Sequence, residues 1–280
     1  MSPMARAISL AHSPDSDDAF MFYGIAGGKV DTRRLRFKEE LADIETLNRR
    51  AMEGVHDITA VSFHAYTRVR DKYRLMTCGA SVGDGYGPLI VSRRPLSRQD
   101  LDEVTVAVPG ELTTGFLVLR LFNPAARWKV VPFDRIPEAV SRGDADAGLL
   151  IHEGQITYRD HKLHRVQDLG EWWRMETGLP LPLGANAIRR TLDATTTGRC
   201  CDVLRDSIRY ALEHRKEALD YALEFARGLD RARAEKFVGM YVNSSSLELG
   251  ERAVAAVSLL FKLGHEAGLI PARVEPEFVG

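Results

Sequence analysis

The order of apolar and polar segments is the feature that most limits the fold of this chain. Residues 8–11 are a short apolar segment, the polar run 13–18 follows, and an apolar helical segment then extends from Ala19 to the glycine pair Gly27 and Gly28. The polar run supplies side chains that can cap a helix, so the three parts predict a strand, a turn and a helix. The same order recurs along the chain and predicts an α/β fold with mainly parallel or mixed sheets.

Further elements follow the same pattern. Ile44, Leu47 and Ala51 lie on one helical face, and Gly54 ends that helix. Other strands are predicted at residues 58–62, 74–77, 88–92, 104–108, 130–133 and 145–151. Other helices are predicted at residues 113–119, 136–142, 202–229 and 253–267. Strands and helices therefore alternate over most of the chain.

Two lobes are predicted from the length and from a second start of the pattern. The chain has 280 residues, and a domain usually contains roughly 100–200. The sequence of strand, turn and helix starts again with the strand at 104–108, which predicts the beginning of a second lobe. The proline-rich segment 179–184 predicts a return to the first lobe. We therefore expect a discontinuous large lobe, residues 1–94 and 189–280, closed by the last two helical segments, and a small lobe, residues 95–188.

The composition is that of a globular protein and excludes several functions. Apolar residues make up 45% of the chain and charged residues 28%, which provides a normal core and argues against disorder. The 38 Lys and Arg residues nearly balance the 39 Asp and Glu residues. No excess of positive charge therefore favours nucleic acid or an anionic membrane as a partner.

The expected location is the cytoplasm. The first residues carry no signal-peptide pattern, and no uncharged apolar stretch approaches the roughly 20 residues of a membrane helix. Cys78, Cys200 and Cys201 have no C-x-x-C spacing, which argues against a disulfide framework and a zinc ribbon. The cysteine usage indicates a reducing compartment, and Cys200 and Cys201 are predicted to be buried thiols.

Polar side chains gather where four predicted strands end. They are Ser13 with Asp15, Ser16, Asp17 and Asp18; Ser62 with His64; Thr113 with Thr114; and His152 with Glu153. In open α/β sheets, ligands bind at the carboxyl ends of strands, where helix N-termini present N–H groups. With two lobes, we expect these strand ends to face each other across a ligand cleft.

Each cluster also has a structural interpretation. Thr113 and Thr114 at a helix start suit a carboxylate ligand, and they equally suit helix capping. His152 ends an apolar strand, where it could act as a general base or as a hydrogen-bonded structural histidine. The acidic run 15–18 suits a polar ligand contact or capping. The residues alone leave these alternatives open.

Metal and dinucleotide sites are not favoured. His161 and His164 are flanked by basic residues and complete no metal-ligand motif. Gly83, Gly85 and Gly87 precede a strand instead of following one, so they predict a turn or a close backbone approach. We expect neither a metal nor a cofactor.

Seven short segments occur in order over nearly the whole chain. They are SPDSDDAFMF (13–22), DIETLN (43–48), DITAVSFHAY (57–66), GYGPL (85–89), IHEG (151–154), PLG (182–184) and MYVN (240–243). Together they resemble the 1,4-dihydroxy-6-naphthoate synthase family of the futalosine route to menaquinone. The resemblance implies a two-lobed fold similar to that of type II periplasmic binding proteins, in agreement with the order of the segments.

The resemblance also implies an activity and a set of residues. The family converts cyclic dehypoxanthine futalosine to 1,4-dihydroxy-6-naphthoate without a cofactor, as a carbon–carbon lyase that releases the sugar-derived portion. His152 matches the histidine proposed as general base in that family. The positions expected to bind the substrate, an aryl carboxylate, are Ser13, Asp18, Asn48, Ser62, Thr113 and Thr114.

The first loop departs from the family pattern, and other functions compete. Many members have Cys-Pro-Asn-Asp-Thr after the first Ser-Pro, where this chain has Asp15-Ser16-Asp17-Asp18-Ala19, so contacts to the sugar side of the substrate are expected to differ, with Asp18 retained. The alternatives are chorismate dehydratase of the same pathway and a binding protein for a small carboxylate that does no chemistry. The expected partner is the small molecule, with a homodimer as an alternative to a monomer.

Overall fold

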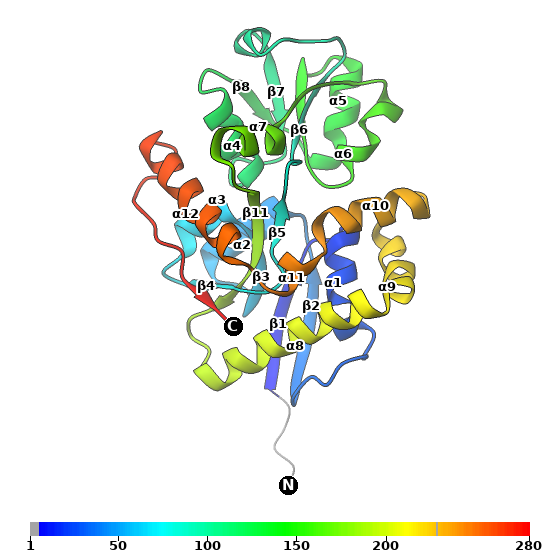
Figure 1. Cartoon of the computed structure of the whole chain (residues 1–280), viewed down its shortest axis with the longest axis vertical. Helices are drawn as coiled ribbons and strands as arrows, with labels where there is room; N and C mark the ends of the chain where they lie inside the picture. The colour runs from blue at the N-terminus through cyan, green and yellow to red at the C-terminus, as the bar shows by residue number, and fades with distance from the viewer. Residues whose placement is uncertain (1–5, 228) are drawn as a thin grey trace. The chain divides into compact units, whose positions relative to one another are not determined.

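The computed structural model describes residues 6–227 and 229–280, which belong to two compact units (Figure 1). Unit 1 contains the chain up to Val82, Gly184–Glu251 and Pro276–Gly280. Unit 2 contains Gly83–Leu183 and Arg252–Glu275. Each unit is an α/β structure with its own sheet, which confirms the predicted class.

The sheet of unit 1 is mixed. Its strands are β1 (Arg6–His12), β2 (Leu35–Leu41), β3 (Ile58–Ser62), β4 (Tyr73–Met76), β5 (Ser81–Gly83), β11 (Leu181–Arg189) and β12 (Phe278–Val279). The order is β12-β4-β11-β3-β1-β2, and β5 pairs with β11. β1 is parallel to both β2 and β3, whereas β11 is antiparallel to β3 and β4. The carboxyl ends of β1, β2 and β3 therefore lie at one edge of the sheet.

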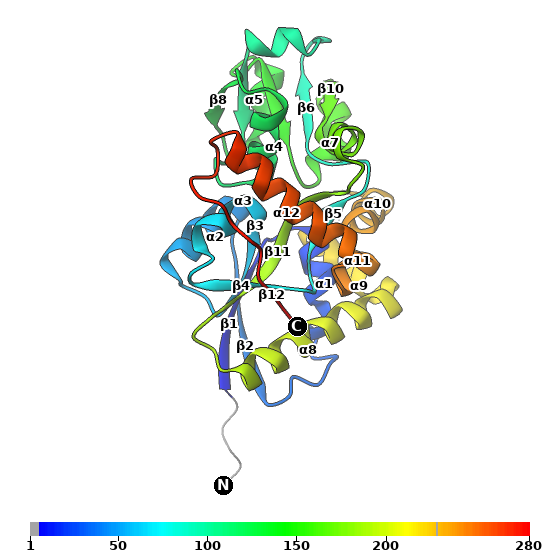
Figure 2. The same cartoon turned by 60° about the vertical axis from the view of Figure 1, so that its left-hand side comes forward.

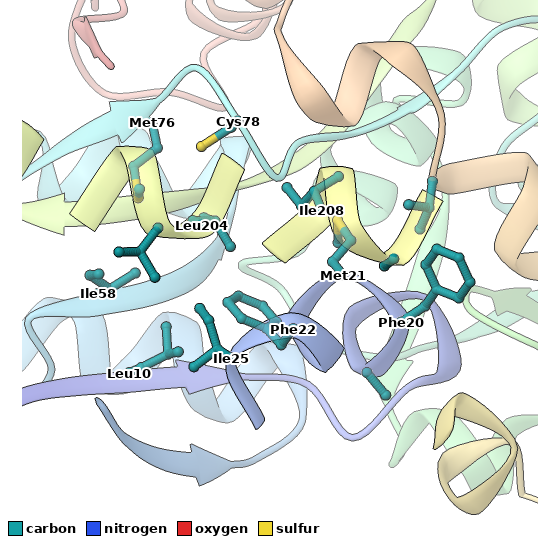
Figure 3. Packing of buried hydrophobic residues seen from close by; sticks show 14 of the residues in the cluster. Leu10, Phe20, Met21, Phe22, Ile25, Ile58, Met76, Cys78, Leu204 and Ile208 are labelled. Carbon is teal, nitrogen blue, oxygen red and sulfur yellow. The ribbon is translucent and has the colours of Figure 1, made fainter. Parts of the chain in front are cut away.

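The helices of unit 1 bury their apolar faces against this sheet and against each other. They are α1 (Ser16–Ala26), α2 (Ile44–Glu53), α3 (Phe63–Val69), α8 (Ala194–Glu213), α9 (Arg215–Ala222), η4 (Leu223–Phe225), α10 (Arg231–Tyr241) and α11 (Ser244–Leu247). Figure 3 shows the core between α1 and α8, in which Phe22 and Ile25 of α1 lie near Leu10 of the sheet and Leu204 of α8. This packing fixes α1, and with it the loop that precedes α1.

Unit 2 has a five-stranded mixed sheet of order β10-β6-β9-β7-β8. Its strands are β6 (Leu89–Ser92), β7 (Thr105–Val108), β8 (Arg127–Val130), β9 (Ala147–Leu150) and β10 (His164–Asp168). Its helices are η1 (Gln99–Asp102), α4 (Thr114–Phe122), η2 (Phe133–Arg135), α5 (Ile136–Arg142), α6 (Gly154–Thr157), η3 (Tyr158–His161), α7 (Leu169–Thr177) and α12 (Glu251–Glu266). The central pair β7 and β9 is parallel, so their carboxyl ends also share one edge.

The boundaries of the units differ from the expected division at residues 94 and 188. β6 pairs with β9 and β10, so the chain from Gly83 onwards belongs to unit 2. On the return, β11 pairs with β3 from Gly184 onwards, which brings the chain back to unit 1 before residue 189. Strand pairing, and not the proline-rich sequence, sets both boundaries.

The last long helix lies in unit 2 and not, as expected, in the first lobe. The chain from Arg252 to Glu275, which includes most of α12 (Figure 2), belongs to unit 2. Gly264 of α12 packs closely there: a Cβ at this position would lie 2.6 Å from Ile270 Cδ1 and 3.3 Å from Leu117 Cδ1 of α4. Helical periodicity identifies the apolar face of α12 but not the element that covers it.

Two other local predictions have different outcomes. The strand expected at 130–133 is wrong, because β8 ends at Val130 and a 3-10 turn begins at Phe133, after Pro132, which has no N–H for a sheet. The close backbone approach expected at the glycines of 83–87 is confirmed. A Cβ at Gly87 would lie 3.0 Å from the backbone nitrogen of Gly170.

The burial predicted for Cys200 and Cys201 is confirmed, and Cys78 shares it. Cys78, Cys200 and Cys201 are free, and all three are buried in unit 1. Burial raises the pKa of Cys78 and of Cys200 to about 12, and that of Cys201 to about 11. Among the described helices, none is both long and apolar enough to cross a bilayer.

These thiols are expected to report on the unfolding of unit 1. Because the thiolate is the reactive form, at pH 8 all three should react with a disulfide reagent at least about a hundredfold more slowly than a free cysteine. Labelling should reach the free rate in denaturant, at the concentration at which unit 1 unfolds. Rapid stoichiometric labelling of any of the three under native conditions would contradict the packing described here.

Candidate active site

Four of the predicted residues lie at the carboxyl edge of the unit 1 sheet. Parallel pairing of β1 with β3 aligns Leu10 with Ile58 and Ala11 with Thr59. The two strands therefore end side by side, and Ser13 and Ser62 follow at the same edge. The turn after β1 leads into α1, and Ser62 directly precedes α3.

The loop before α1 is built on Asp18. Its Oδ2 accepts hydrogen bonds from the backbone N–H of Ser13 at 2.8 Å and from the Ser13 hydroxyl at 2.7 Å. Burial raises the pKa of Asp18, whereas the neighbouring His12 and the two Ser13 bonds oppose this rise. Asp18 thus closes the turn between β1 and α1.

His12 is a site residue that sequence reasoning did not single out. It is 3% exposed, its ring stacks on that of Phe22 with centroids 4.3 Å apart, and its Nδ1 lies 2.9 Å from the Ser13 carbonyl oxygen. Because a carbonyl only accepts, Nδ1 carries the proton in this contact. The imidazole therefore holds the carbonyl of Ser13, whereas Asp18 holds its N–H and hydroxyl groups. Its position at the strand end, directly before Ser13, was the signal in the sequence.

Asn48 and Ser62 form a reciprocal pair. The Asn48 amide nitrogen donates to the Ser62 hydroxyl at 3.0 Å, and the Ser62 backbone N–H donates to Asn48 Oδ1 at 2.9 Å. Asn48 is 0% exposed. Asp43 begins α2 by accepting from the backbone N–H of Thr46, so the helix carries Asn48 to the end of β3. The pair fixes the Ser62 hydroxyl at the edge of the sheet.

The other three predicted residues lie at the carboxyl edge of the unit 2 sheet. β7 and β9 are parallel, with Val106 opposite Ala147. The turns after Val108 and Leu150 therefore begin at the same edge of the sheet. Gly115, in the first turn of α4, packs against the segment after β9: a Cβ at Gly115 would lie 3.5 Å from Ile151 Cγ2. The start of α4 therefore lies against the residue that precedes His152.

Both threonine hydroxyl groups at the start of α4 have partners within unit 2. Thr113 is the N-cap: its Oγ1 accepts from the backbone N–H of Phe116 at 3.2 Å and donates to the Gly110 carbonyl at 2.9 Å. The Thr114 hydroxyl donates to the Leu183 carbonyl at 2.6 Å. Capping, one of the two interpretations of Thr113, is therefore present. A carboxylate here would accept mainly from backbone N–H groups of the first turn.

His152 has a backbone conformation that is unusual for its residue type. Its φ is +51°, in the left-handed region that favours glycine. The residue is half-buried, its carbonyl accepts from the backbone N–H of Gln155 at 3.1 Å, and its ring meets Phe133 edge to face at 5.2 Å between centroids. At this turn the imidazole therefore lies next to an aromatic side chain.

The predicted residues fall into two groups, each assembled within its own unit. Ser13, Asp18, Asn48 and Ser62 share the edge of unit 1, and Thr113, Thr114 and His152 share the edge of unit 2. Phe133, which precedes α5, joins the second group without any signal in the sequence. Within residues 6–227 and 229–280, no group of three or more His, Cys, Asp and Glu side chains is arranged to hold a metal ion.

Comparison with known proteins decides the family. The profile of a family described as menaquinone biosynthesis matches residues 8–266. The chain belongs to this menaquinone biosynthesis family. A Thermus thermophilus relative is 41% identical over 274 residues, which is 98% of this chain and 100% of the relative. A Streptomyces coelicolor relative is 37% identical and covers 96% of each chain. Both are named 1,4-dihydroxy-6-naphthoate synthase, which confirms the resemblance seen in the seven segments.

Solved structures confirm the fold of this family member. A protein of Archaeoglobus fulgidus is 48% identical, with a TM-score of 0.91 over 94% of this chain and 98% of that chain. The alkanesulfonate-binding protein of Xanthomonas axonopodis pv. citri, at 12% identity, has a TM-score of 0.76 over 98% and 97% of the two chains. A Candida albicans protein with the generic periplasmic binding protein fold, at 14% identity, has a TM-score of 0.70 over 98% and 96%. The fold is therefore that of the periplasmic binding proteins.

The Asn48 and Ser62 pair yields a prediction for stability. Asn48→Ala leaves the Ser62 N–H and hydroxyl buried without the amide, so the free energy of unfolding should fall by about 1–3 kcal/mol. Asn48→Asp retains two acceptors but places a charge at a fully buried position, and it should destabilise at least as much. Chemical denaturation of the variants and the parent measures both effects. Equal stability of Asn48→Ala and the parent would show that the pair contributes nothing.

Proposed function

We propose that this chain is a 1,4-dihydroxy-6-naphthoate synthase. It converts cyclic dehypoxanthine futalosine to 1,4-dihydroxy-6-naphthoate and releases the sugar-derived portion, as a carbon–carbon lyase that needs no cofactor. His152 is the general base, and Ser13, Asp18, Asn48, Ser62, Thr113 and Thr114 bind the aryl carboxylate substrate. The reaction takes place in the cytoplasm. The names of the relatives support the activity, and the local geometry of His152 supports the assignment of the base.

The single observation that carries the assignment is the left-handed conformation of His152 beside the start of α4. Non-glycine residues with positive φ have a backbone cost of order 1–3 kcal/mol, and such residues cluster at functional sites. Here His152 follows β9 at the carboxyl edge of the unit 2 sheet, and Ile151 before it packs against Gly115 in the first turn of α4. A histidine that served only to fill the core would not need this turn.

The chemistry of the fragmentation matches the groups at this edge. A proton that a nearby carbonyl makes acidic must be removed, and a neutral imidazole is suited to this near neutral pH. The carboxylate of the substrate lies at the N-terminus of α4, where backbone N–H groups and the helix dipole favour an anion. Thr113 and Thr114 shape this turn through their bonds to Gly110 and Leu183. Phe133, which already contacts the imidazole, offers an aromatic surface to the naphthalene ring.

The residues of unit 1 bind the rest of the substrate in this proposal. Ser62, held by Asn48, donates its hydroxyl proton to an oxygen on which negative charge develops. Asp18 uses Oδ2 for both Ser13 bonds, so its Oδ1 accepts from a hydroxyl group of the sugar-derived portion. This contact replaces the amide and hydroxyl side chains that other members carry at positions 17 and 19.

The test is turnover of cyclic dehypoxanthine futalosine by the parent and by His152→Asn, with mass-spectrometric detection of the naphthoate. Asparagine is tolerated in the left-handed region, so this variant keeps the turn and removes the base. The rate should fall by about 10²–10⁴-fold, the usual contribution of a general base. His161→Asn, at an exposed position outside the site, is the matched control and should keep the parent rate.

Each other outcome removes part of the proposal. If the His152→Asn protein turns over the substrate at the parent rate, His152 is not the general base. A parent that binds the substrate tightly in calorimetry but releases no product is a carboxylate-binding protein. A parent that acts on chorismate and not on the futalosine derivative is the dehydratase of the same pathway.

A further inference from the structure

Asp15 is a buried carboxylate in the loop that carries Ser13 and Asp18. It is 1% exposed and directly precedes α1. Arg227 approaches it from a segment 213 positions beyond Pro14: Nη1 lies 2.8 Å from Asp15 Oδ1, and Nη2 donates to the Pro14 carbonyl at 3.3 Å. One guanidinium thus contacts two consecutive residues of the loop.

An arginine is specifically suited to this double contact. A buried carboxylate is costly unless a cation and hydrogen bonds compensate it. The planar guanidinium presents several N–H groups in a fixed geometry, so it can pair with the Asp15 carboxylate and donate to the Pro14 carbonyl at the same time. A lysine ammonium supplies the charge from a single point. The side chain of Arg227 is only one-third exposed, so water screens this pair less than it screens a surface ion pair.

The backbone of Arg227 indicates that the side chain is required at this place. Its φ is +47°, a conformation that favours glycine and that arginine adopts at a cost. The residue follows η4, in the connection that leads to α10. A turn of this kind normally has glycine or asparagine. An arginine here is conformationally strained, and its side-chain contact offsets that cost.

We propose that Arg227 is a positioning residue for the substrate-binding loop 13–18. It holds Asp15 and Pro14, and thereby keeps Ser13 and Asp18 in the geometry in which they meet the sugar side of the substrate. This inference rests on the proposed function for its kinetic consequence only. Arg227 acts through the loop and does not touch the reacting atoms.

The central variant is Arg227→Gly, which suits the left-handed turn and removes the guanidinium. KM for the futalosine derivative should rise by about tenfold to a hundredfold with a smaller change in kcat, because the loop binds the sugar side and not the reacting carbon. Amide hydrogen exchange in a peptide covering residues 13–19 should become at least about tenfold faster, because the Ser13 N–H loses its fixed acceptor. Arg227→Lys keeps the charge but cannot contact both residues in the same way, so it should recover only part of both losses.

Two further variants separate the contact from a general effect on folding. Arg231→Ala removes a nearby exposed ion pair with Asp220 and is the matched control, with KM and exchange as in the parent. Asp15→Asn removes the buried charge, and the double variant Asp15→Asn with Arg227→Gly should be less impaired than the product of the two single effects.

The outcomes of this experiment distinguish the positioning role of Arg227 from the proposed activity. If the parent does not turn over the substrate, the proposed function fails, and exchange at 13–19 still tests Arg227. If the parent is active and Arg227→Gly shows parent KM and parent exchange, the inference is overturned. A fall in activity without faster exchange at 13–19, or effects of the two residues that simply multiply, overturns it as well.

Discussion

Parallel pairing of neighbouring strands is the constraint on which the candidate site depends. β1 lies beside β3 in unit 1, and β7 lies beside β9 in unit 2. Because parallel strands end at the same edge, residues far apart in sequence meet there without any direct bond between them. Thr113 and His152 are brought to one edge in this way, as are Ser13 and Ser62. Helix starts lie at the same edges, so each unit presents N–H groups where polar side chains gather.

Backbone strain at two positions reinforces this arrangement. His152 and Arg227 both have positive φ although neither is glycine. At His152 the residue in the turn places its imidazole beside Phe133. At Arg227 the turn delivers a guanidinium to Asp15. Such conformations persist only when surrounding packing determines them. Ala226, directly before Arg227, belongs to the core of unit 1, and Leu150, two residues before His152, belongs to the core of unit 2.

Local pattern predicted much of the fold, and long-range packing explains what it missed. β3 at Ile58–Ser62 and α5 at Ile136–Arg142 match the predicted ranges, because apolar period and turn residues act over a few neighbours. The placement of α12 in unit 2 depends on what covers its apolar face, which periodicity does not encode. Strand-end position identified six of the seven site residues as candidates, and Asn48 came only from the family resemblance. The contacts of Arg227 and Phe133 join segments that no local signal connects.

The most direct measurement is a crystal structure of the protein with bound 1,4-dihydroxy-6-naphthoate. The account predicts that the carboxylate accepts hydrogen bonds from backbone N–H groups in the first turn of α4. It also predicts that an imidazole nitrogen of His152 lies within hydrogen-bond reach of the ring substituents, at about 2.6–3.2 Å directly or through one water. A naphthoate whose carboxylate is held elsewhere, with the His152 imidazole out of reach of the ring, would contradict the central claim.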